Sequence, residues 1–351
     1  LARDRCGEKP LYWAKRDGVF IFGSEIRALV AAGVEKKMNR SRVSEYLQFR
    51  YVAEPDTMLE GVYTIPAGHL WTSDSMSTRR WWSVPDLEAV EQTTEGLHEL
   101  VKRSVKLSSS SDRKMALHLS AGIDSSVLLA EMCRQGKDLT TITAGFLGRS
   151  DEAVVASSFA AQMGVNHRVA MLEPSDIRSL PRVVEQMELP VGDALVVAFD
   201  RLAIETSNAG CHVAMGGEGV DEIFGGYSFH KVMLLADILG PVGRRVAAAM
   251  LQLLPTQWVS QLSAFPAPIG QSGKRKVVEY LSHFDRLSAV EKGVALRSLY
   301  SAEETGERSL ILDHDAVSDS RLLEDHLGLQ FDGWLQDWAI IRQERNPMAH
   351  S

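Results

Sequence analysis

The chain has 351 residues, which is enough for two domains and a sizeable apolar core. Its 45% hydrophobic and 24% charged residues are typical of a soluble globular protein, and its net charge of −8 argues against nucleic acid as a main partner. No run of about 18 uncharged apolar residues predicts a membrane span. Three cysteines without a CxxC pair argue against a disulfide framework or a thiolate zinc site and favour a cytoplasmic location.

The first 84 residues contain short apolar runs separated by turn signals. Two such runs flank Arg16-Asp17-Gly18, which predicts a β-hairpin. Helices are expected over 24–32 and 42–49, and strands with turns over 61–80. The composition changes near residues 82–86, where we place a domain boundary.

From residue 88 the pattern alternates between strands and helices. The expected strands are 115–119, 140–146, 167–172 and 211–215. The expected helices are 91–106, 125–135, 151–163, 175–187 and 193–207, with helical periodicity again from about 227. This alternation predicts an α/β fold, a doubly wound parallel sheet with helices on both faces, and ligands at the carboxyl ends of its strands.

The most informative segment is residues 115–136, MALHLSAGIDSSVLLAEMCRQG. A strand runs through a turn of small residues into a helix, which is an arrangement that binds phosphate groups. No lysine follows the glycine, as it would in a Walker A loop. Instead Ser120, Ser125 and Ser126 supply hydroxyls, and Asp124 lies among them. A carboxylate beside phosphates needs a cation, so this turn predicts a Mg²⁺ ion.

Glycine and serine also occur in such turns for purely structural reasons, as turn formers and helix caps. The complete string SAGIDSS at 120–126 is more specific, because it resembles the pyrophosphate loop SGGxDSS of the ATP pyrophosphatases. Ala121 replaces the first glycine of that loop. Alanine there costs affinity if the position needs a positive φ or a close phosphate approach, and it is harmless at ordinary backbone angles.

A second group of charged residues follows the strand expected at 211–215. Glu218, Asp221 and Glu222 lie between two glycine pairs in the string GGEGVDEIFGGY at 216–227. Such acids suit a second Mg²⁺ ligand and a group that binds ammonium or handles protons, although a solvated surface turn would also contain them. Because both motifs follow strands of one parallel sheet, Asp124 and Asp221 are expected to face one Mg²⁺–pyrophosphate.

The second motif is similar to SGEGxDExFGGY of the asparagine synthetase family, with Gly216 in place of serine. Residues 3–12 and 23–29, RDRCGEKPLY and GSEIRAL, resemble the late part of the family's glutaminase domain. Residues 65–69 with 80–82 resemble the end of that domain, and 342–351 resemble the segment KVDRMSMAHS. The chain is therefore identified as a member of the glutamine-hydrolysing asparagine synthetase family, class II amidotransferases with an ATP-pyrophosphatase synthetase domain.

The resemblance implies two domains. Residues 1–84 would be the remainder of an α+β glutaminase-like domain of the N-terminal nucleophile type, and 88–351 an ATP-binding domain truncated at its C-terminus. Leu1 is not the family's nucleophilic cysteine, so we expect a fragment lacking both ends that is itself inactive as a glutaminase.

The implied reaction is amide formation that consumes ATP. The side-chain carboxylate of aspartate is adenylated with release of pyrophosphate, and ammonia derived from glutamine then displaces AMP to give asparagine. ATP and Mg²⁺ are the implied cofactors, and a homodimer is one expected assembly. Two alternatives stay open: a related amide ligase of the β-lactam synthetase or peptide cyclase type, and a non-catalytic relative that binds nucleotide.

The resemblance also assigns roles by position. The residues implied to bind ATP are Leu119, Ser120, Gly122, Asp124, Ser125, Ser126, Ala144, Gly216 and Gly217. Asp124 and Asp221 are the implied Mg²⁺ ligands, and together with Glu218, the acid implied for acyl-adenylate formation, they form the implied catalytic set. His118 and His230 are expected to be packed or surface histidines rather than catalysts.

Overall fold

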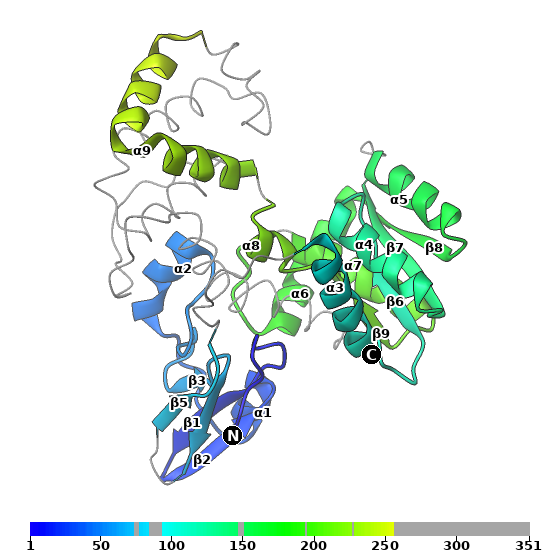
Figure 1. Cartoon of the computed structure of the whole chain (residues 1–351). Coiled ribbons are helices and arrows are strands. Elements are labelled where there is room, and N and C mark those ends of the chain that lie inside the picture. The colour runs from blue at the N-terminus through cyan, green and yellow to red at the C-terminus, as the bar shows by residue number, and fades with distance from the viewer. Residues whose placement is uncertain (74–76, 84–92, 147–150, 194, 227, 256–351) are drawn as a thin grey trace. The chain divides into compact units, whose positions relative to one another are not determined.

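The computed structural model describes residues 1–73, 77–83, 93–146, 151–193, 195–226 and 228–255 (Figure 1). The chain divides into two compact units. The first unit holds residues 1–46 and 50–218, and the second holds Leu47–Phe49 and the described residues from Gly219 onward. The boundary expected near residues 82–86 falls partly on 84–92, which lie outside the described residues.

The N-terminal part of the first unit contains two small antiparallel sheets. One has the strand order β2 (Val19–Gly23), β1 (Tyr12–Arg16), β3 (Val62–Thr64), and the other pairs β4 (His69–Thr72) with β5 (Ser77–Arg80). The helices of this region are α1 (Ile26–Ala31), the 3-10 helix η1 (Arg40–Arg42) and α2 (Val43–Phe49), whose last turn belongs to the second unit.

The predicted hairpin is confirmed by β1 and β2. Arg16 pairs with Val19, and the two residues between them have positive φ, 50° at Asp17 and 78° at Gly18. Positive φ at both central residues matches the right-handed twist of the flanking strands, and Asp-Gly is a favoured pair for that turn. One face of the resulting sheet is buried against α1, through Tyr12, Ala14, Val62, Ile26 and Leu29.

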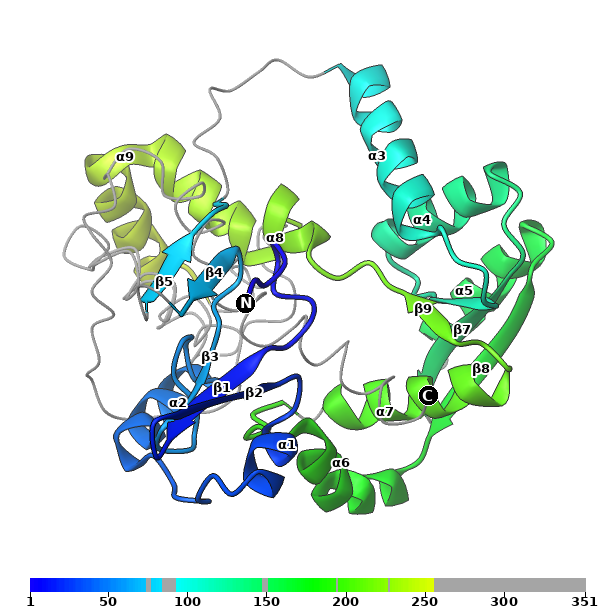
Figure 2. The same ribbon diagram turned by 90° about the horizontal axis from the view of Figure 1, so that it is seen from below.

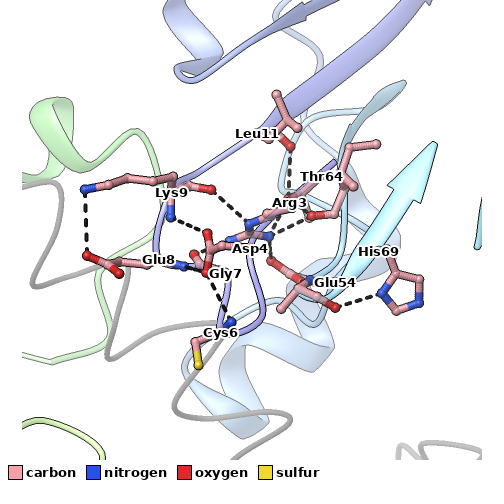
Figure 3. A network of polar contacts seen from close by, with 12 residues as sticks. Arg3, Asp4, Cys6, Gly7, Glu8, Lys9, Leu11, Glu54, Thr64 and His69 are labelled. Carbon is pink, nitrogen blue, oxygen red and sulfur yellow. Dashed lines mark hydrogen bonds and ion pairs between the residues drawn. The ribbon is translucent and has the colours of Figure 1, made fainter. Parts of the chain in front are cut away.

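The buried guanidinium of Arg3 fixes the start of the chain (Figure 3). It donates to the carbonyl oxygens of Gly7, Lys9 and Ile65 at 2.8, 3.1 and 2.8 Å, and it pairs with the Glu54 carboxylate. The Arg3 side chain is only 1% exposed. A charge buried to this degree is stable only because every donor meets an acceptor.

The adjacent carboxylate of Asp4 organises the turn that follows (Figure 3). It accepts backbone N–H groups of Cys6, Glu8 and Lys9 at 3.1, 2.9 and 2.9 Å. The motif that begins with Arg3 and Asp4 therefore has a structural role in this part of the chain.

The larger sheet of the first unit is parallel, with the order β8-β7-β6-β9 (Figures 1 and 2). Its strands are β6 (Met115–His118), β7 (Leu139–Phe146), β8 (Asn166–Leu172) and β9 (Val213–Met215). The accompanying helices are α3 (Thr94–Ser108), α4 (Ile123–Arg134), α5 (Asp151–Gln162), η2 (Pro174–Ser179), α6 (Leu180–Met187) and α7 (Leu195–Asn208). The predicted α/β fold with a parallel sheet is confirmed.

Apolar side chains cover both faces of this sheet. The cluster on one face joins β6 to α3, α4 and α5, and it includes Val105, Met115, Leu117, Leu129, Met132 and Ala160. The cluster on the other face joins Ala116, Ile142 and Ala170 of three strands to Leu202 of α7. Because successive residues of a strand point to opposite faces, β6 contributes to both clusters.

The second unit contains α8 (Val220–Phe224) and α9 (Ser228–Leu253). Gly240, with φ 59° and ψ −179°, interrupts the helical geometry inside α9. Neither α9 nor any other helix of the described residues is both long and apolar enough to cross a membrane. The helical periodicity predicted from about 227 is confirmed as far as Leu253, and its continuation lies outside the described residues.

Two predicted helices differ from those observed. The helix expected from residue 91 begins at Thr94, because the hydroxyl of Thr93 accepts the Gly96 N–H at 3.0 Å and caps the helix there. The helix expected over 175–187 is divided into η2 and α6. Pro181, in the first turn of α6, has no N–H to donate, which suits a helix start better than an interior.

We expect Arg3→Met to destabilise the chain by about 3 kcal/mol, because it leaves the Glu54 carboxylate buried without its cation. Urea unfolding followed by circular dichroism measures this change. The matched control is Arg5→Met, an exposed position two residues away, which should change the free energy of unfolding by less than about 0.5 kcal/mol. Equal effects of the two substitutions would contradict the structural role of Arg3.

Candidate functional site

The candidate site begins at the carboxyl edge of the parallel sheet. β6 pairs with β7 on one side and with β9 on the other, and Leu117 is in register with Met215. Parallel strands end at the same edge, so the segments that follow β6 and β9 start beside each other. These segments open the two motifs singled out in the sequence.

Backbone and side-chain hydrogen bonds hold the end of β6 against β7. The N–H of Leu119 donates to the carbonyl of Ile142 at 2.9 Å, and the Thr143 hydroxyl donates to the carbonyl of Leu119 at 2.6 Å. Leu119 itself is buried, and Ala144 lies half-buried two residues beyond Ile142 on β7. The polar groups of Leu119 are thus paired within the sheet, and the chain leaves it in a fixed direction.

The turn from Ser120 to Gly122 is organised by the buried hydroxyl of Ser125. The N–H of Ser120 donates to Ser125 Oγ at 3.0 Å, and the two serine hydroxyls lie 2.9 Å apart. Ser120 Oγ also accepts the N–H of Gly122 at 3.1 Å, while the Ser126 hydroxyl donates to the Gly122 carbonyl at 2.8 Å. The serines predicted to bind phosphate therefore also hold the loop in shape.

The loop ends in the first turn of α4, whose N-cap is Gly122. No side chain caps this helix, so the first-turn N–H groups of α4 have no side-chain acceptor at the cap. Asp124 is the acidic residue of this turn and is partly exposed. A helix start without a side-chain cap can bind an anion.

Ala121 stands where the resembling loop has glycine, so its backbone conformation decides whether the position needs a positive φ. Among the described residues other than glycine, φ is positive only at Asp17, Arg50 and Glu188. Gly122, with φ −74° and ψ 156°, is also in an ordinary extended conformation. Neither position of this loop therefore needs glycine for its backbone angles.

Gly217 brings the second motif against the first. A Cβ atom added there would lie 3.2 Å from Asp124 Cβ and 3.4 Å from the Ser125 backbone nitrogen. The first of these distances is tighter than most real Cβ contacts, so the absence of a side chain permits the approach. Gly216 is half-buried beside it, and Glu218 is exposed. The structure thus brings 216–218 and the 120–126 loop together.

The rest of the second motif lies in the second unit. α8 is bounded by Gly219 and Gly225, with φ of 93° and 73°, values that favour glycine. Burial raises the pKa of Asp221, the neighbouring charge of Glu222 raises it further, and His230 opposes the shift. Glu222 and His230 are both buried, so of the two expected placements His230 has the packed one.

His118 is half-buried at the end of β6, and its environment sets its protonation. Thr206 donates its single hydroxyl proton to the Leu202 carbonyl at 2.8 Å, so its oxygen can only accept from His118 Nε2, 3.1 Å away. Nδ1 of His118 is buried without a hydrogen-bond partner. Burial lowers the pKa of His118 from 6.5 to about 4, which leaves the ring neutral near pH 7.

Two residues that support the site were not predicted. Thr143 and Thr206 act on Leu119 and His118 from β7 and α7, and no local motif marks them. Among the described residues, no group of three or more histidine, cysteine or acidic side chains is placed to hold a metal ion.

Comparison with known proteins matches both parts of the chain. Residues 96–351 match the family model described as asparagine synthase, and residues 1–82 match the glutamine amidotransferase domain. The chain is 28% identical to glutamine-hydrolyzing asparagine synthetase 1 of Bacillus subtilis over 238 residues, which are 66% of this chain and 38% of that protein.

Other relatives show similar identity. Asparagine synthetase 3 of Bacillus subtilis is 27% identical over 289 residues, 75% of this chain and 46% of that protein. Amidase chyE of Penicillium rubens is 26% identical over 263 residues, 67% of this chain and 39% of that protein. The chain therefore spans less than half the length of each of these relatives.

The neutral state of His118 predicts a specific loss of stability in acid. Its folded pKa of about 4 lies below the usual 6.5, so as the pH falls through this interval protons bind the unfolded chain preferentially. Between pH 7 and pH 5 this one group should lower the free energy of unfolding by about 2 kcal/mol. Urea unfolding of wild type and His118→Gln at the two pH values measures the difference, since glutamine does not titrate.

The control is His212→Gln, which removes an exposed histidine next to β9. That variant should keep the pH dependence of the wild type. A His118→Gln variant with an unchanged pH dependence would show that His118 is not held neutral in the folded chain.

Proposed function

We propose a function from the premise that the chain belongs to the asparagine synthase family, whose model matches residues 96–351 and so more than half of its length. The whole protein forms an amide at the expense of ATP. It adenylates the side-chain carboxylate of aspartate with release of pyrophosphate, and ammonia from glutamine then displaces AMP to give asparagine. The proposed class is a C–N bond-forming ligase.

The approach of Gly217 to the first turn of α4 is the observation that carries this proposal. It brings the segment that follows β9 to Asp124 and to the backbone nitrogen of Ser125. An anion at the uncapped end of α4 would thus meet backbone N–H groups, serine hydroxyls and residues of both motifs. An enzyme that transfers a nucleotide to a carboxylate needs such a site to accommodate charge that grows on the leaving pyrophosphate.

Each residue of the loop has a proposed part in binding ATP. Ser120, Gly122, Ser125 and Ser126 bind the pyrophosphate portion through hydroxyl and N–H groups. The residues proposed to border adenosine are Leu119, Ala144, Gly216 and Gly217. The sheet that carries them is proposed to be a doubly wound ATP-pyrophosphatase domain.

Mg²⁺ fits the residues at this edge. Asp124 offers a partly exposed carboxylate, and Gly217 places no side chain against this residue. Few protein ligands suffice, because Mg²⁺ usually keeps water and phosphate oxygens in its coordination shell. Asp124 and Asp221 are the proposed ligands, and the bound ion would supply positive charge against the phosphates.

Glu218 is proposed to act on the substrate side of the site. It follows Gly217 directly and is exposed, so its carboxylate can reach a bound molecule without being desolvated in advance. Its proposed role is to orient the acceptor carboxylate for formation of the acyl-adenylate, the step that releases pyrophosphate. His118, neutral and bonded to Thr206, is not needed for this step.

The N-terminal part of the chain supplies the proposed link to glutamine. Residues 1–82 match the glutamine amidotransferase domain, and we propose residues 1–84 as part of a glutaminase-type domain that delivers ammonia to an ATP-binding domain from residue 88. The nucleophile for glutamine hydrolysis is not among the residues of this chain that match the family's motifs.

The comparisons do not decide which acceptor carboxylate the whole protein uses. A relative named as an amidase is 26% identical to the chain and one named as an asparagine synthetase is 28% identical, so overall similarity does not select the acceptor. Pyrophosphate release by the whole protein with aspartate, compared with other carboxylic acids, tests the choice. Binding of ATP with Mg²⁺ in calorimetry, without pyrophosphate release on any of these acids, would favour the non-catalytic relative that binds nucleotide.

We expect Asp124→Asn to lower aspartate-dependent pyrophosphate release at least about 100-fold, because it removes a charge that balances the cation at the reacting phosphates. Glu218→Gln should lower release to a similar extent while leaving ATP binding within about threefold. The assay is enzyme-coupled detection of pyrophosphate, with calorimetric titration of ATP and Mg²⁺.

The matched control is Asp138→Asn, an exposed aspartate immediately before β7 at the opposite edge of the sheet. It should keep nearly all activity. Wild-type rates in Asp124→Asn would overturn the proposed site.

Ala121→Gly should change the affinity for ATP by less than about twofold, because φ at this position is not in the region that favours glycine. Calorimetric titration compares the variant with wild type. A gain of tenfold or more would mean that the Ala121 methyl group stands in the way of a phosphate.

A further inference from the structure

Glu188 lies at a strained point in the first unit, just after α6. It is the C-cap of that helix, with φ 55° and ψ 13°, and its N–H donates to the Val184 carbonyl at 3.1 Å. Left-handed geometry at a helix end normally favours glycine or asparagine. A glutamate in this conformation has a cost in stability that its side chain must offset.

The side chain of Glu188 caps a different helix. Its Oε2 accepts the N–H of Ile26 at 2.6 Å, and its Oε1 accepts the N–H of Arg27 at 3.0 Å and Arg27 Nε at 2.5 Å. Ile26 and Arg27 begin α1, which lies beside α6 (Figure 2). The N-cap residue of α1, Glu25, makes no capping bond itself. The Glu188 side chain is 7% exposed, so these bonds are largely shielded from water.

The residues after Glu188 continue the contact with the N-terminal region. Leu189 packs against the apolar cluster formed by β1, β3 and α1. Leu189 and Pro190 also line a cavity together with residues of 51–64. This cavity has a volume of about 30 Å³, enough for a water molecule. A Cβ atom at Gly192 would lie 2.5 Å from Arg50 Cβ, so this close approach requires glycine. We call residues 188–192 the docking segment.

The docking segment is joined firmly to the parallel sheet. Arg182 of α6 forms two hydrogen bonds to the carboxylate of Asp200 on α7, at 3.2 and 2.6 Å, and the Asp200 side chain is 4% exposed. α7 in turn packs on the sheet through Leu202 and bonds to His118 on β6 through Thr206. β6 leads directly into the 120–126 loop. A continuous set of packed elements therefore runs from α1 to the candidate site.

We propose that Glu188 is a positioning residue that keeps the glutaminase-type region 1–82 docked on the ATP-binding region and so couples glutamine to amide formation. The coupling role of Glu188 rests on the proposed function, because its catalytic test measures that activity. Glu188 touches no reacting atom in this proposal. Its carboxylate accepts three N–H donors from α1, and charge-assisted bonds of this kind are stronger than those of a neutral side chain.

The geometry offers a substitution that separates docking from folding. Glu188→Gly removes the carboxylate yet suits the left-handed backbone, so α6 keeps its C-cap. Glu188→Gln keeps one acceptor oxygen and loses the charge, so it should show a partial effect. Glu185→Gln, an exposed position on the same helix, is the matched control.

The catalytic test compares pyrophosphate release by the whole protein with glutamine and with ammonium as nitrogen source. Glu188→Gly should lower the glutamine-supported rate about tenfold or more relative to the ammonium-supported rate, which should stay within about twofold of wild type. The ratio of the glutamine-supported to the ammonium-supported rate in Glu188→Gln should lie between those of Glu188→Gly and wild type. In Glu185→Gln this ratio should match wild type. An unchanged ratio in Glu188→Gly would overturn the coupling role.

Hydrogen exchange on the same proteins tests docking without activity. In Glu188→Gly the amides of Ile26 and Arg27 should exchange about tenfold faster or more, while the amides of β6 and β7 keep their protection. Unchanged exchange in α1 would overturn the docking contact itself. A wild-type protein inactive with both nitrogen sources would refute the proposed function, and the exchange data would still decide the contact.

Discussion

The parallel pairing of β6 with β9 is the constraint on which the candidate site depends. It is a backbone interaction between segments almost 100 residues apart, and it sets the edge at which both motifs begin. Buried apolar clusters on both faces of the sheet hold β6 in this position. Because the strand ends are fixed, a short loop with a few serine hydroxyls suffices to define an anion site. Without this strand pairing, the residues of the two motifs would not lie together and could not contact one ligand.

Local chemistry allowed much of the fold to be predicted. Asp17-Gly18 predicts its hairpin because few residue pairs accept positive φ twice, and the alternation of strands and helices predicts the parallel sheet. The turn at 120–126 could be identified as a phosphate-binding loop because small residues, serine hydroxyls and one carboxylate stand together between a strand and a helix. The ends of the elements were predicted less accurately, because the cap at Thr93 and Pro181 in the first turn of α6 override the apolar periodicity around them.

Long-range partners could not be predicted in this way. Thr143, Thr206 and Glu188 act on residues 24, 88 and 162 positions away, and their own sequence surroundings contain no unusual pattern. Arg3 belongs to a motif that is visible in the sequence, but its burial against Glu54 depends on the packing of the N-terminal sheets. The roles proposed for Asp124, Asp221 and Glu218 come from the family resemblance, because a sequence shows where the acids stand and not what they bind.

Gly217 has a consequence for how the two motifs can change. A side chain at Gly217 would enter the volume next to the Asp124 side chain. A larger residue in one loop therefore requires the other loop to move. The loops after β6 and β9 therefore have to change together, although Asp124 and Gly217 are 93 positions apart in the sequence (217 − 124). In a chimera between members of the family, these two loops would have to be exchanged together for either to keep its shape.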